Sequence, residues 1–494
     1  TPRSTQWGEC AMNKSIRFGA TFSLLLIVAL LVNLSIIQTF KEEEYAQDER
    51  NSRLTLELRQ INRGQIIAGN EVLAESFKND SDIYQRSYPR MPFSFAPVLG
   101  YVSNTYGTSQ LEAGFNAELM GETGSGASRF LRTGRESDRK GNTVELTIDP
   151  QLQALAYDQL SDRGYSGAIV ALRPSSGEVL AMASSPSYDP NTISNPETTE
   201  QAWADINSDP GQPLINHSTQ EQLPPGSIFK IITSAAGLRS GYTPDSMLTG
   251  EAETMLPGTN VPLTNYDGKA CGSGGDVPLS TAFALSCNTA FVQMALDIGP
   301  DAVREAATAF GVGERYDLGL PTASGSLGDV PGGAELAQTA IGQRDVTMTA
   351  LQAAVMAGVV ANDGVRMAPY VVGRVLRPDQ SEISATKPNE LNEAITPDEA
   401  ATLKDLMFGS ERNTSGYDGN GFASKTGTAE HAEGADPHVW YVAFDPAKDV
   451  AVAVVVKNGG NAGPSATGGR VSAPIGRAIL NAAPAGPAAD AEGR

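Results

Sequence analysis

Three short motifs, separated by long stretches of chain, constrain this sequence most. In chain order they are Ser227-Ile-Phe-Lys230, Ser286-Cys-Asn288 and Lys425-Thr-Gly427. Residues three apart share one face of a helix, so the first motif brings a hydroxyl and an amine together. The second motif adds a hydroxyl and an amide, and the third adds an amine on an expected edge strand. These groups are typical of a serine acyltransferase in which lysine acts as the general base.

The residues around Ser227 support this interpretation. Leu223–Gly226 contains two prolines and cannot be helical, whereas the apolar run over Ile228–Leu238 predicts a buried helix. Ser227 is therefore expected at the helix N-terminus, where the helix dipole favours an alkoxide and disfavours protonation of Lys230. A second cation at Lys425 would lower the pKa of Lys230 further and leave a neutral base. The alternative, a helix-capping serine followed by a solvated lysine, would not require the other two motifs.

Other chemistries have less support. The chain has three histidines, His217, His431 and His438, and no Gly-x-Ser-x-Gly elbow, so each histidine is expected to be a surface or satisfied polar residue. No C-x-x-C or H-E-x-x-H spacing is present, and we expect neither a metal nor a cofactor. A net charge of −21 argues against nucleic-acid binding, which needs a basic face.

One apolar stretch predicts a membrane anchor. Residues 18–40 are almost wholly apolar and, at about 1.5 Å per residue, long enough for a bilayer core of about 30 Å. Lys14 and Arg17 precede this stretch, so the positive-inside rule predicts a cytoplasmic segment over residues 1–17 and an outside location for the rest. A cleavable signal peptide is the alternative, but the stretch ends without a small-x-small cleavage site.

The cysteines predict one disulfide. Cys271 and Cys287 are both expected outside the cytoplasm, where a bridge can persist, whereas Cys10 is expected inside. The bridge would contribute about 3 kcal/mol in the chain-entropy model. It would also brace the second motif, because Cys287 lies between Ser286 and Asn288. The alternative is a pair of small buried thiols.

Composition predicts further divisions after the anchor. Residues 41–142 are expected to form a smaller pedestal or dimerisation-like module, with an amphipathic helix near Asn51–Gln60 and a Gly-, Ser- and Arg-rich linker over residues 121–142. Residues 143–482 form a denser domain, and residues 483–494 a disordered tail rich in Ala, Pro and Gly.

Within residues 143–482, helical and strand patterns interleave, which predicts a mixed α/β fold. The expected helices are Pro150–Leu160, Ile228–Leu238, Thr347–Ala361 and Ala473–Leu480. Two hairpins are expected, Gly167–Leu172 with Val179–Ala183 and Trp440–Phe444 with Val450–Lys457.

Together with further motifs, these features resemble the class B penicillin-binding proteins, which are monofunctional peptidoglycan D,D-transpeptidases, and within them the actinobacterial penicillin-binding protein A group. The spacing of the three motifs is also that of this family. Two departures stand out: Asn216-His217 replaces the usual Asn-Arg, and Gly342-Gln343-Arg344 replaces a frequent G-Q-G. The further motifs are Arg63-Gly-Gln-Ile66 with Leu73-Ala74, Leu146-Thr-Ile-Asp149 with Leu152-Gln153, Gly177–Ser184, Pro186–Asn191, Gly342-Gln343, Ala361–Gly364 and Pro369.

The resemblance implies a penicillin-binding and serine β-lactamase-like fold, in which helices flank an antiparallel sheet (α+β). Ser227 would attack the D-Ala–D-Ala carbonyl of a peptidoglycan stem peptide, and Lys230 would take its proton. Ser286 would relay a proton to the leaving amine, and Asn288 would hold Lys230 and the substrate amide. The remaining implied residues are Lys425, Thr426 and Thr428 for the substrate carboxylate, Gly427 for close approach of the strand to the substrate, and the backbone N–H groups of Ser227 and Thr428 for the oxyanion hole.

The resemblance also implies partners and alternatives. β-Lactams would be covalent inhibitors at Ser227, and a membrane glycan polymerase with other cell-wall and division proteins would be the protein partners. A D,D-carboxypeptidase or a β-lactamase-like hydrolase is one alternative, although no Glu-x-x-Leu-Asn lies between Ser286 and Lys425. A β-lactam sensor or polymerase scaffold is another, and it would be expected to lack a motif residue.

Overall fold

The computed structural model describes residues 7–40, 60–122, 140–431 and 434–486. The chain divides into two compact units, Thr1–Gln60 and Ile61–Arg494. Three predictions fall largely outside the described residues: the amphipathic helix near Asn51–Gln60, the linker over residues 121–142 and the disordered tail.

The first unit contains helix α1 (Trp7–Phe40). Its segment Ile16–Asn33 is long and apolar enough to cross a membrane, and none of it is buried inside the protein. This segment overlaps the predicted anchor. Exposed apolar side chains over such a length indicate a membrane-anchored protein.

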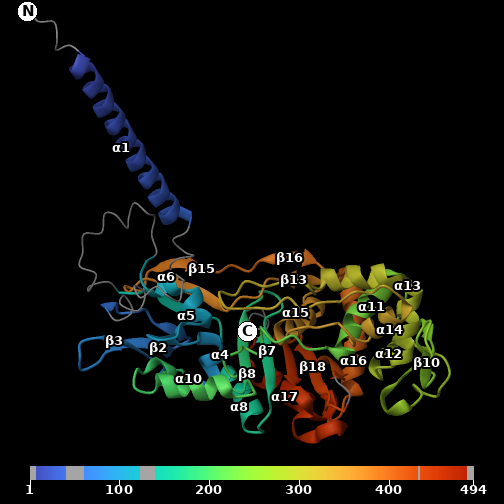
Figure 1. Cartoon of the computed structure of the whole chain (residues 1–494). Helices are drawn as coiled ribbons and strands as arrows, with labels where there is room; N and C mark the ends of the chain where they lie inside the picture. Colours follow the sequence, from blue (N-terminus) through green and yellow to red (C-terminus); the bar gives the residue numbers. More distant parts are fainter. Residues whose placement is uncertain (1–6, 41–59, 123–139, 432–433, 487–494) are drawn as a thin grey trace, which may run out of the picture. The chain divides into compact units, whose positions relative to one another are not determined.

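The second unit begins with a six-stranded sheet in the order β15-β14-β6-β1-β2-β3 (Figure 1). Strand β6 pairs in parallel with β1 and antiparallel with β14. Strands from both sides of residue 143, the predicted domain boundary, therefore share one sheet. The strands are β1 (Ile66–Ala68), β2 (Glu71–Lys78), β3 (Tyr84–Ser87), β6 (Thr143–Leu146), β14 (Val372–Leu376) and β15 (Glu382–Ala385).

A buried ion cluster ties this region to helix α5 (Gln110–Gly114). The carboxylate of Glu112 accepts hydrogen bonds from Nε of Arg63 and from Nε of Arg86, each at 2.6 Å. Burial raises the pKa of Glu112, but the two guanidinium groups outweigh burial and lower it. Arg63 opens the Arg-Gly-Gln-Ile motif, so this motif anchors the start of the unit.

The central sheet is antiparallel, in the order β17-β18-β19-β7-β8. Both predicted hairpins are present, and the strand that carries Lys425 lies at an edge, as predicted. All residues of β7, β8, β18 and β19 are buried, because helices cover both faces of the sheet. The strands are β7 (Gly167–Leu172), β8 (Val179–Ser185), β17 (Ala423–Ala429), β18 (His438–Asp445) and β19 (Val450–Val456).

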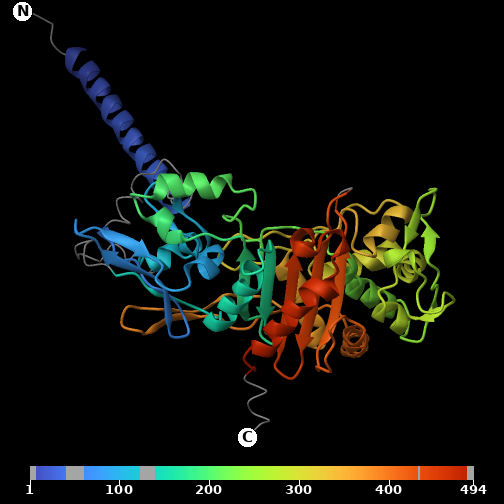
Figure 2. The same ribbon diagram turned by 90° about the horizontal axis from the view of Figure 1, so that it is seen from below.

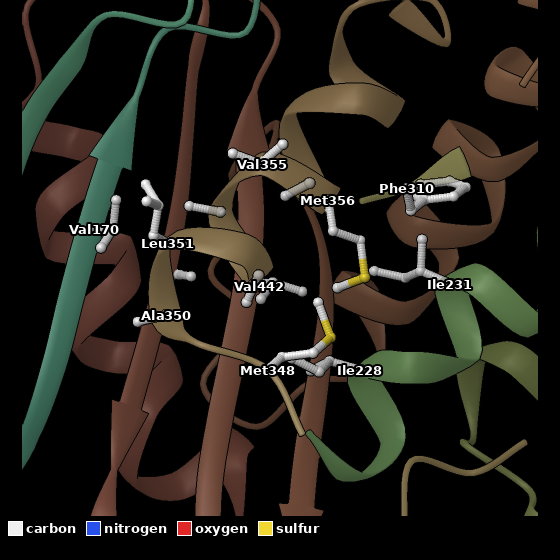
Figure 3. Packing of buried hydrophobic residues seen from close by; sticks show 14 of the residues in the cluster. Val170, Ile228, Ile231, Phe310, Met348, Ala350, Leu351, Val355, Met356 and Val442 are labelled. Carbon is white, nitrogen blue, oxygen red and sulfur yellow. The ribbon is translucent and has the colours of Figure 1, made fainter. Parts of the chain in front are cut away.

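Each face of the central sheet has its own hydrophobic core. Helices α8 (Pro150–Ser161) and α17 (Gly468–Ala482) pack on one face (Figure 2). Helix α15 (Ala350–Ala361) packs on the other, where its Leu351 and Val355 lie near Val170 and Val442 of the strands (Figure 3). Successive side chains of a strand point to opposite faces of the sheet, so each strand contributes residues to both cores.

Helix boundaries follow local capping. Asp149 caps α8 by accepting a hydrogen bond from Leu152 N at 2.8 Å. The helix predicted from Thr347 begins instead at Ala350, because Thr349 forms a capping box with Gln352.

A helical lobe lies beside the edge strand β17 and completes the fold (Figure 1). It contains η2 (Gly226–Phe229), α11 (Lys230–Arg239), α12 (Leu279–Ala284), α13 (Asn288–Ala309), α14 (Gly333–Thr339), α16 (Pro397–Arg412), β9 (Met247–Leu248), β10 (Glu253–Met255), β11 (Pro262–Thr264), η3 (Tyr266–Gly268) and β12 (Val277–Pro278). The other elements are α4 (Pro92–Leu99), β4 (Val102–Ser103), β5 (Gly107–Thr108), α6 (Asn116–Leu119), α9 (Pro190–Ser194), α10 (Thr199–Ser208), β13 (Val365–Met367), β16 (Glu390–Glu393) and η4 (Lys457–Ser465).

Candidate active site

Ser227 lies in a tight turn rather than in an α-helix. The turn is the 3₁₀ helix η2, and α11 begins only at Lys230, whereas the sequence predicted an α-helix from Ile228. The prolines before Gly226 and its φ of +56° explain the difference, because they shape a turn that an α-helix cannot follow directly. Residues three apart eclipse one another in a 3₁₀ helix, so Ser227 and Lys230 still share a face.

Three contacts hold the turn that carries Ser227, which we call the Ser227 turn (residues 224–229). The carbonyl of Pro224 accepts a hydrogen bond from Nε1 of Trp440 at 2.9 Å. The N–H of Gly226 donates to the carbonyl of Gly342 at 2.8 Å. Ile228 packs near Met348, ahead of α15 (Figure 3). The Gly342-Gln343 motif thus supports the turn directly, and Trp440 is a supporting residue that sequence reasoning missed.

Gly427 allows the edge strand to approach the Ser227 turn. A Cβ atom at Gly427 would lie 2.7 Å from the carbonyl oxygen of Pro225 and 3.1 Å from Cγ2 of Ile228. The sequence predicted that this glycine admits the substrate; in the structure the close contact is with the protein's own turn. The glycine therefore sets the distance between Ser227 and the Lys-Thr-Gly strand.

Lys230 is fully buried and points at the second motif. Its Nζ lies within hydrogen-bonding distance of the carbonyl oxygen of Ser286 at 2.7 Å, of Oδ1 of Asn288 at 2.7 Å and of Oγ of Ser286 at 3.2 Å. None of its hydrogen bonds among the described residues goes to Ser227. Burial and then the nearby Lys425 lower the pKa of Lys230 well below its usual value. The amine is therefore suited to accept a proton.

Ser286 lies between the two amines in a strained conformation. Its φ is +61°, a region that residues other than glycine seldom adopt and that often marks functional sites. Its Oγ is 3.2 Å from Nζ of Lys230 and 2.9 Å from Nζ of Lys425. A hydroxyl can donate and accept at once, so Ser286 can pass a proton between these neighbours.

The rest of the second motif is tied to the lobe. The side chain of Asn288 donates to the carbonyl of Thr264 at 2.9 Å. A disulfide joins Cys271 and Cys287, whose Cα atoms are 5.9 Å apart. Cys271 N donates to the carbonyl of Gly250 at 2.7 Å. The bridge lies where the sequence predicted it and links the Ser-Cys-Asn turn to a separate loop.

Lys425 is almost completely buried, with 1% of its surface exposed. Its Nζ donates to Oγ of Ser286 at 2.9 Å and to the carbonyl of Thr426 at 3.1 Å. Burial lowers the pKa of Lys425 to about 7, so near neutral pH the amine is present in both its charged and its neutral form. Thr426 and Thr428 are half-buried on one face of β17.

Glu411 supports the edge strand from behind, and sequence reasoning missed it. This buried carboxylate of α16 accepts hydrogen bonds from the hydroxyl groups of Ser424 and Tyr441, from Nε of Arg477 at 2.7 Å and from Nδ2 of Asn420 at 3.2 Å. Ser424 immediately precedes Lys425. No spacing in the sequence connects α16 with β17, so only the fold reveals this contact.

The described residues contain no group of three or more His, Cys, Asp or Glu side chains that could hold a metal ion. The site consists of two amines, two hydroxyls and an amide. Chemically, it can activate a serine without a histidine or a metal.

Comparisons with known proteins agree with this geometry. The penicillin binding protein transpeptidase domain family matches residues 167–481. This chain belongs to that family. The penicillin binding protein A dimerisation domain family matches residues 63–144. The family and the fold class predicted from the sequence are therefore confirmed.

Named relatives cover nearly the whole chain. Peptidoglycan D,D-transpeptidase PbpA of Mycolicibacterium smegmatis is 43% identical over 490 residues, which cover 96% of this chain and 99% of that protein. PbpA of Mycobacterium tuberculosis is 42% identical over 492 residues, with the same coverage of 96% and 99%.

Solved structures are similar as well. The crystal structure of penicillin-binding protein A from M. tuberculosis matches with a TM-score of 0.81 at 43% identity, over 86% of this chain and 99% of that chain. Its ceftriaxone acyl-enzyme complex matches with a TM-score of 0.82 at 42% identity, over 87% and 99%. The transpeptidase fold is thus shared over almost the entire second unit.

Proposed function

We propose that this chain is a peptidoglycan D,D-transpeptidase that forms an acyl-enzyme at Ser227. The proposal rests mainly on Lys230, the last residue of the Ser-x-x-Lys motif. Its amine is fully buried, and the pKa of this amine is lowered. Relatives named D,D-transpeptidase at 42–43% identity over nearly the full chain support the same reaction.

In the first step, Oγ of Ser227 attacks the carbonyl carbon between the two terminal D-alanines of a stem peptide. Neutral Lys230 takes the hydroxyl proton as the C–O bond forms. The C–N bond then breaks, and the leaving D-alanine amine receives a proton from Ser286, which Lys230 reprotonates. Asn288 orients Lys230 and would contact the substrate amide.

In the second step, the amine of a neighbouring stem peptide attacks the acyl-enzyme. Its proton returns through Ser286 and Lys230, and the Ser227 ester bond breaks as the cross-link forms. The backbone N–H groups of Ser227 and Thr428 would stabilise the oxyanion in both steps. Close packing of the Ser227 turn on β17 supports this role, since a Cβ at Gly226 would lie 2.7 Å from the carbonyl oxygen of Thr428.

Lys425 would bind the substrate carboxylate together with Thr426 and Thr428. An approaching carboxylate favours the charged form of a nearby amine, so binding would restore the proton that burial removes from Lys425. β-Lactams carry a comparable carboxylate and would acylate Ser227 as covalent inhibitors.

We further propose that α1 anchors the protein with its N-terminus in the cytoplasm and the second unit outside, because Lys14 and Arg17 flank the apolar stretch on one side. The proposed protein partners are a membrane glycan polymerase and other cell-wall and division proteins.

The test is a turnover assay with a synthetic pentapeptide donor and an amine acceptor, read by mass spectrometry. A transpeptidase releases D-alanine and makes the donor–acceptor adduct. Ser227→Ala should abolish both products, and Ser240→Ala, at the exposed far end of α11, should leave both unchanged. Release of D-alanine without any adduct, over a range of acceptors, would favour a carboxypeptidase instead.

A further inference from the structure

All three histidines of the chain lie near the segment that leads to Ser227, linked through Glu221, Lys457 and Asn458. His217, only 1% exposed, contacts Glu221 through Nδ1 at 2.8 Å and the carbonyl of Gly211 through Nε2 at 3.0 Å. Nζ of Lys457 donates to the other carboxylate oxygen of Glu221. The rings of His431 and His438 pack edge to face with centroids 3.9 Å apart, and both contact the residue after Lys457.

The two partners of His217 define its protonation. A backbone carbonyl can only accept a hydrogen bond, so Nε2 must carry a proton to contact Gly211. Burial raises the pKa of Glu221, but hydrogen bonds and charge interactions with His217 and Lys457 outweigh burial and lower it. Lys457 donates to the same carboxylate, which supports its ionised form independently of His217. An ionised carboxylate only accepts hydrogen bonds, so Nδ1 carries a proton too.

We infer that His217 is a buried imidazolium that, through Glu221, positions the Ser227 turn. His217 is thus a positioning residue and not a catalytic one, since it acts on the turn through Glu221. Its effect on the reaction rests on the proposed function of Ser227.

The segment between Glu221 and Ser227 connects the His217–Glu221 contact to the Ser227 turn. Leu223 exchanges two backbone hydrogen bonds with Met348, at 3.0 and 2.9 Å. Pro224 and Gly226 are then held by Trp440 and Gly342, as described above. Among the described residues, Glu221 forms no comparable backbone bridge, and its carboxylate is instead held by the side chains of His217 and Lys457.

Loss of a proton from His217 would break this arrangement. One of its two acceptors would then face a nitrogen lone pair at a site that is nearly inaccessible to water. Glu221 would keep Lys457 as its single cation. The start of the segment would move relative to β19, and the Ser227 turn would lose part of its alignment.

The other ionisable groups nearby leave this role to His217. They are Glu221 on its own segment, Lys457 after β19, His438 on β18 and Asp209, whose carboxylate accepts a hydrogen bond from Gly211 N at 2.7 Å. His438 accepts a hydrogen bond from Asn458 N through Nδ1 at 3.1 Å. Burial and the neighbouring His431 lower the pKa of His438 to about 4, so it adds no positive charge at neutral pH.

A direct test uses the full chain in detergent, labelled with ¹⁵N-histidine. Three imidazoles give three pairs of ring nitrogen signals, which His217→Arg, His431→Gln and His438→Gln assign by loss of one pair each. At neutral pH both ring nitrogens of His217 should be protonated. A neutral His217 ring would overturn the inference. This measurement does not depend on activity, so it stands apart from any failure of the Ser227 assignment.

The kinetic test measures acylation by a fluorescent penicillin from neutral to alkaline pH, over the range in which the protein stays folded. His217→Arg keeps a cation that does not titrate. The ratio of the wild-type rate constant to the His217→Arg rate constant cancels the ionisations of Lys230 and Lys425. We expect this ratio to fall about three- to tenfold as the pH rises.

Two more variants complete the comparison. His217→Gln, which lacks the charge, should acylate about tenfold more slowly than His217→Arg at every pH. His431→Gln, at the exposed end of the group, should follow the wild-type profile. A constant ratio with a wild-type rate for His217→Gln would overturn the inference. Absence of acylation in all proteins would instead contradict the proposed function.

Discussion

Lys230 and Lys425 bring the same chemical group to the same hydroxyl, yet we assign them different roles. Both amines contact Oγ of Ser286, and burial lowers the pKa of both. The charge of Lys425 lowers the pKa of Lys230 further, and Lys230 shares a face of the turn with Ser227. We therefore assign Lys230 as the base. Lys425 lies on the edge strand β17, which also carries the half-buried Thr426 and Thr428, and we propose that it binds the substrate carboxylate.

Exchange of each lysine for arginine tests this division. Arginine does not release its proton at any working pH. Lys230→Arg should therefore lower the acylation rate constant for a labelled penicillin by about 10²–10⁴-fold, the usual contribution of a general base. Lys425→Arg keeps the charge and should retain a measurable fraction of the rate. Equal losses in both variants would contradict the assignment.

The pKa values predict the shape of the pH profile. In the proposed mechanism, acylation requires neutral Lys230 and charged Lys425. Because the pKa of Lys425 is lowered to about 7, its cation is present below that pH and disappears above it. The second-order rate constant for acylation should therefore fall as the pH rises through about 7, since this constant reports on the free enzyme.

Lys425→Arg provides the control for this profile, because guanidinium stays charged. In that variant, the acylation rate constant should decline less at alkaline pH, and any decline that remains should come from His217. An alkaline limb of unchanged size would show that Lys425 is not the group that titrates.

At the scale of single elements, Gly427 sets the spacing between the edge strand and the Ser227 turn. A methyl group there would lie 2.7 Å from a carbonyl oxygen of the turn. Gly427→Ala should separate β17 from the turn and lower acylation by about 10- to 100-fold, the effect of misplacing a reacting group by about 1 Å.

A matched control for this change is Gly421→Ala, just before β17, where a Cβ would meet nothing within 4 Å. That variant should acylate at the wild-type rate. If the two variants behaved alike in acylation and in melting temperature, close packing at Gly427 would not matter.

The disulfide supports another element, the strained Ser-Cys-Asn turn. It joins Cys287 to a loop that is hydrogen-bonded elsewhere in the lobe. Reduction should lower the melting temperature by an amount equivalent to about 2–4 kcal/mol and should lower acylation with it. Peptide mapping of non-reduced protein exported by its host identifies the bridge; free thiols at both positions would refute it.

Several elements could be predicted because their signals are local. The hairpins around residues 173–178 and 446–449 follow from apolar runs separated by turn residues. The Ser227 turn could not be placed fully, because the prolines predict a break but not the 3₁₀ geometry after it. The Glu411 contacts were not predictable, since a buried carboxylate in an amphipathic helix leaves no pattern in the sequence.

At the scale of the whole molecule, the family could be predicted and the first sheet could not. The three ordered motifs, together with the further motifs such as Arg63-Gly-Gln-Ile66, predict the family. The six-stranded sheet joins β1 to β6 and β6 to β14, and pairings between such distant strands depend on the tertiary fold rather than on local propensity.

Because the anchor and the rest of the described chain belong to separate compact units, we expect that the anchor can be removed. Deletion of the residues up to Phe40 should yield a protein that no longer partitions into membranes and still binds labelled penicillin, because the described catalytic groups all lie in the second unit. N-terminal sequencing of the full-length protein extracted from membranes provides the check on cleavage. A mature N-terminus beyond residue 40 would show that the apolar stretch is removed rather than retained.

We propose that Ser227 is acylated with Lys230 as its base. Peptide mass spectrometry tests this directly, after reaction of the wild type and of Ser227→Ala with penicillin at neutral pH. We expect one adduct in the wild type, on the peptide that contains Ser227, and none in the variant. An adduct that persists in Ser227→Ala, or that maps to Ser286, would contradict this proposal.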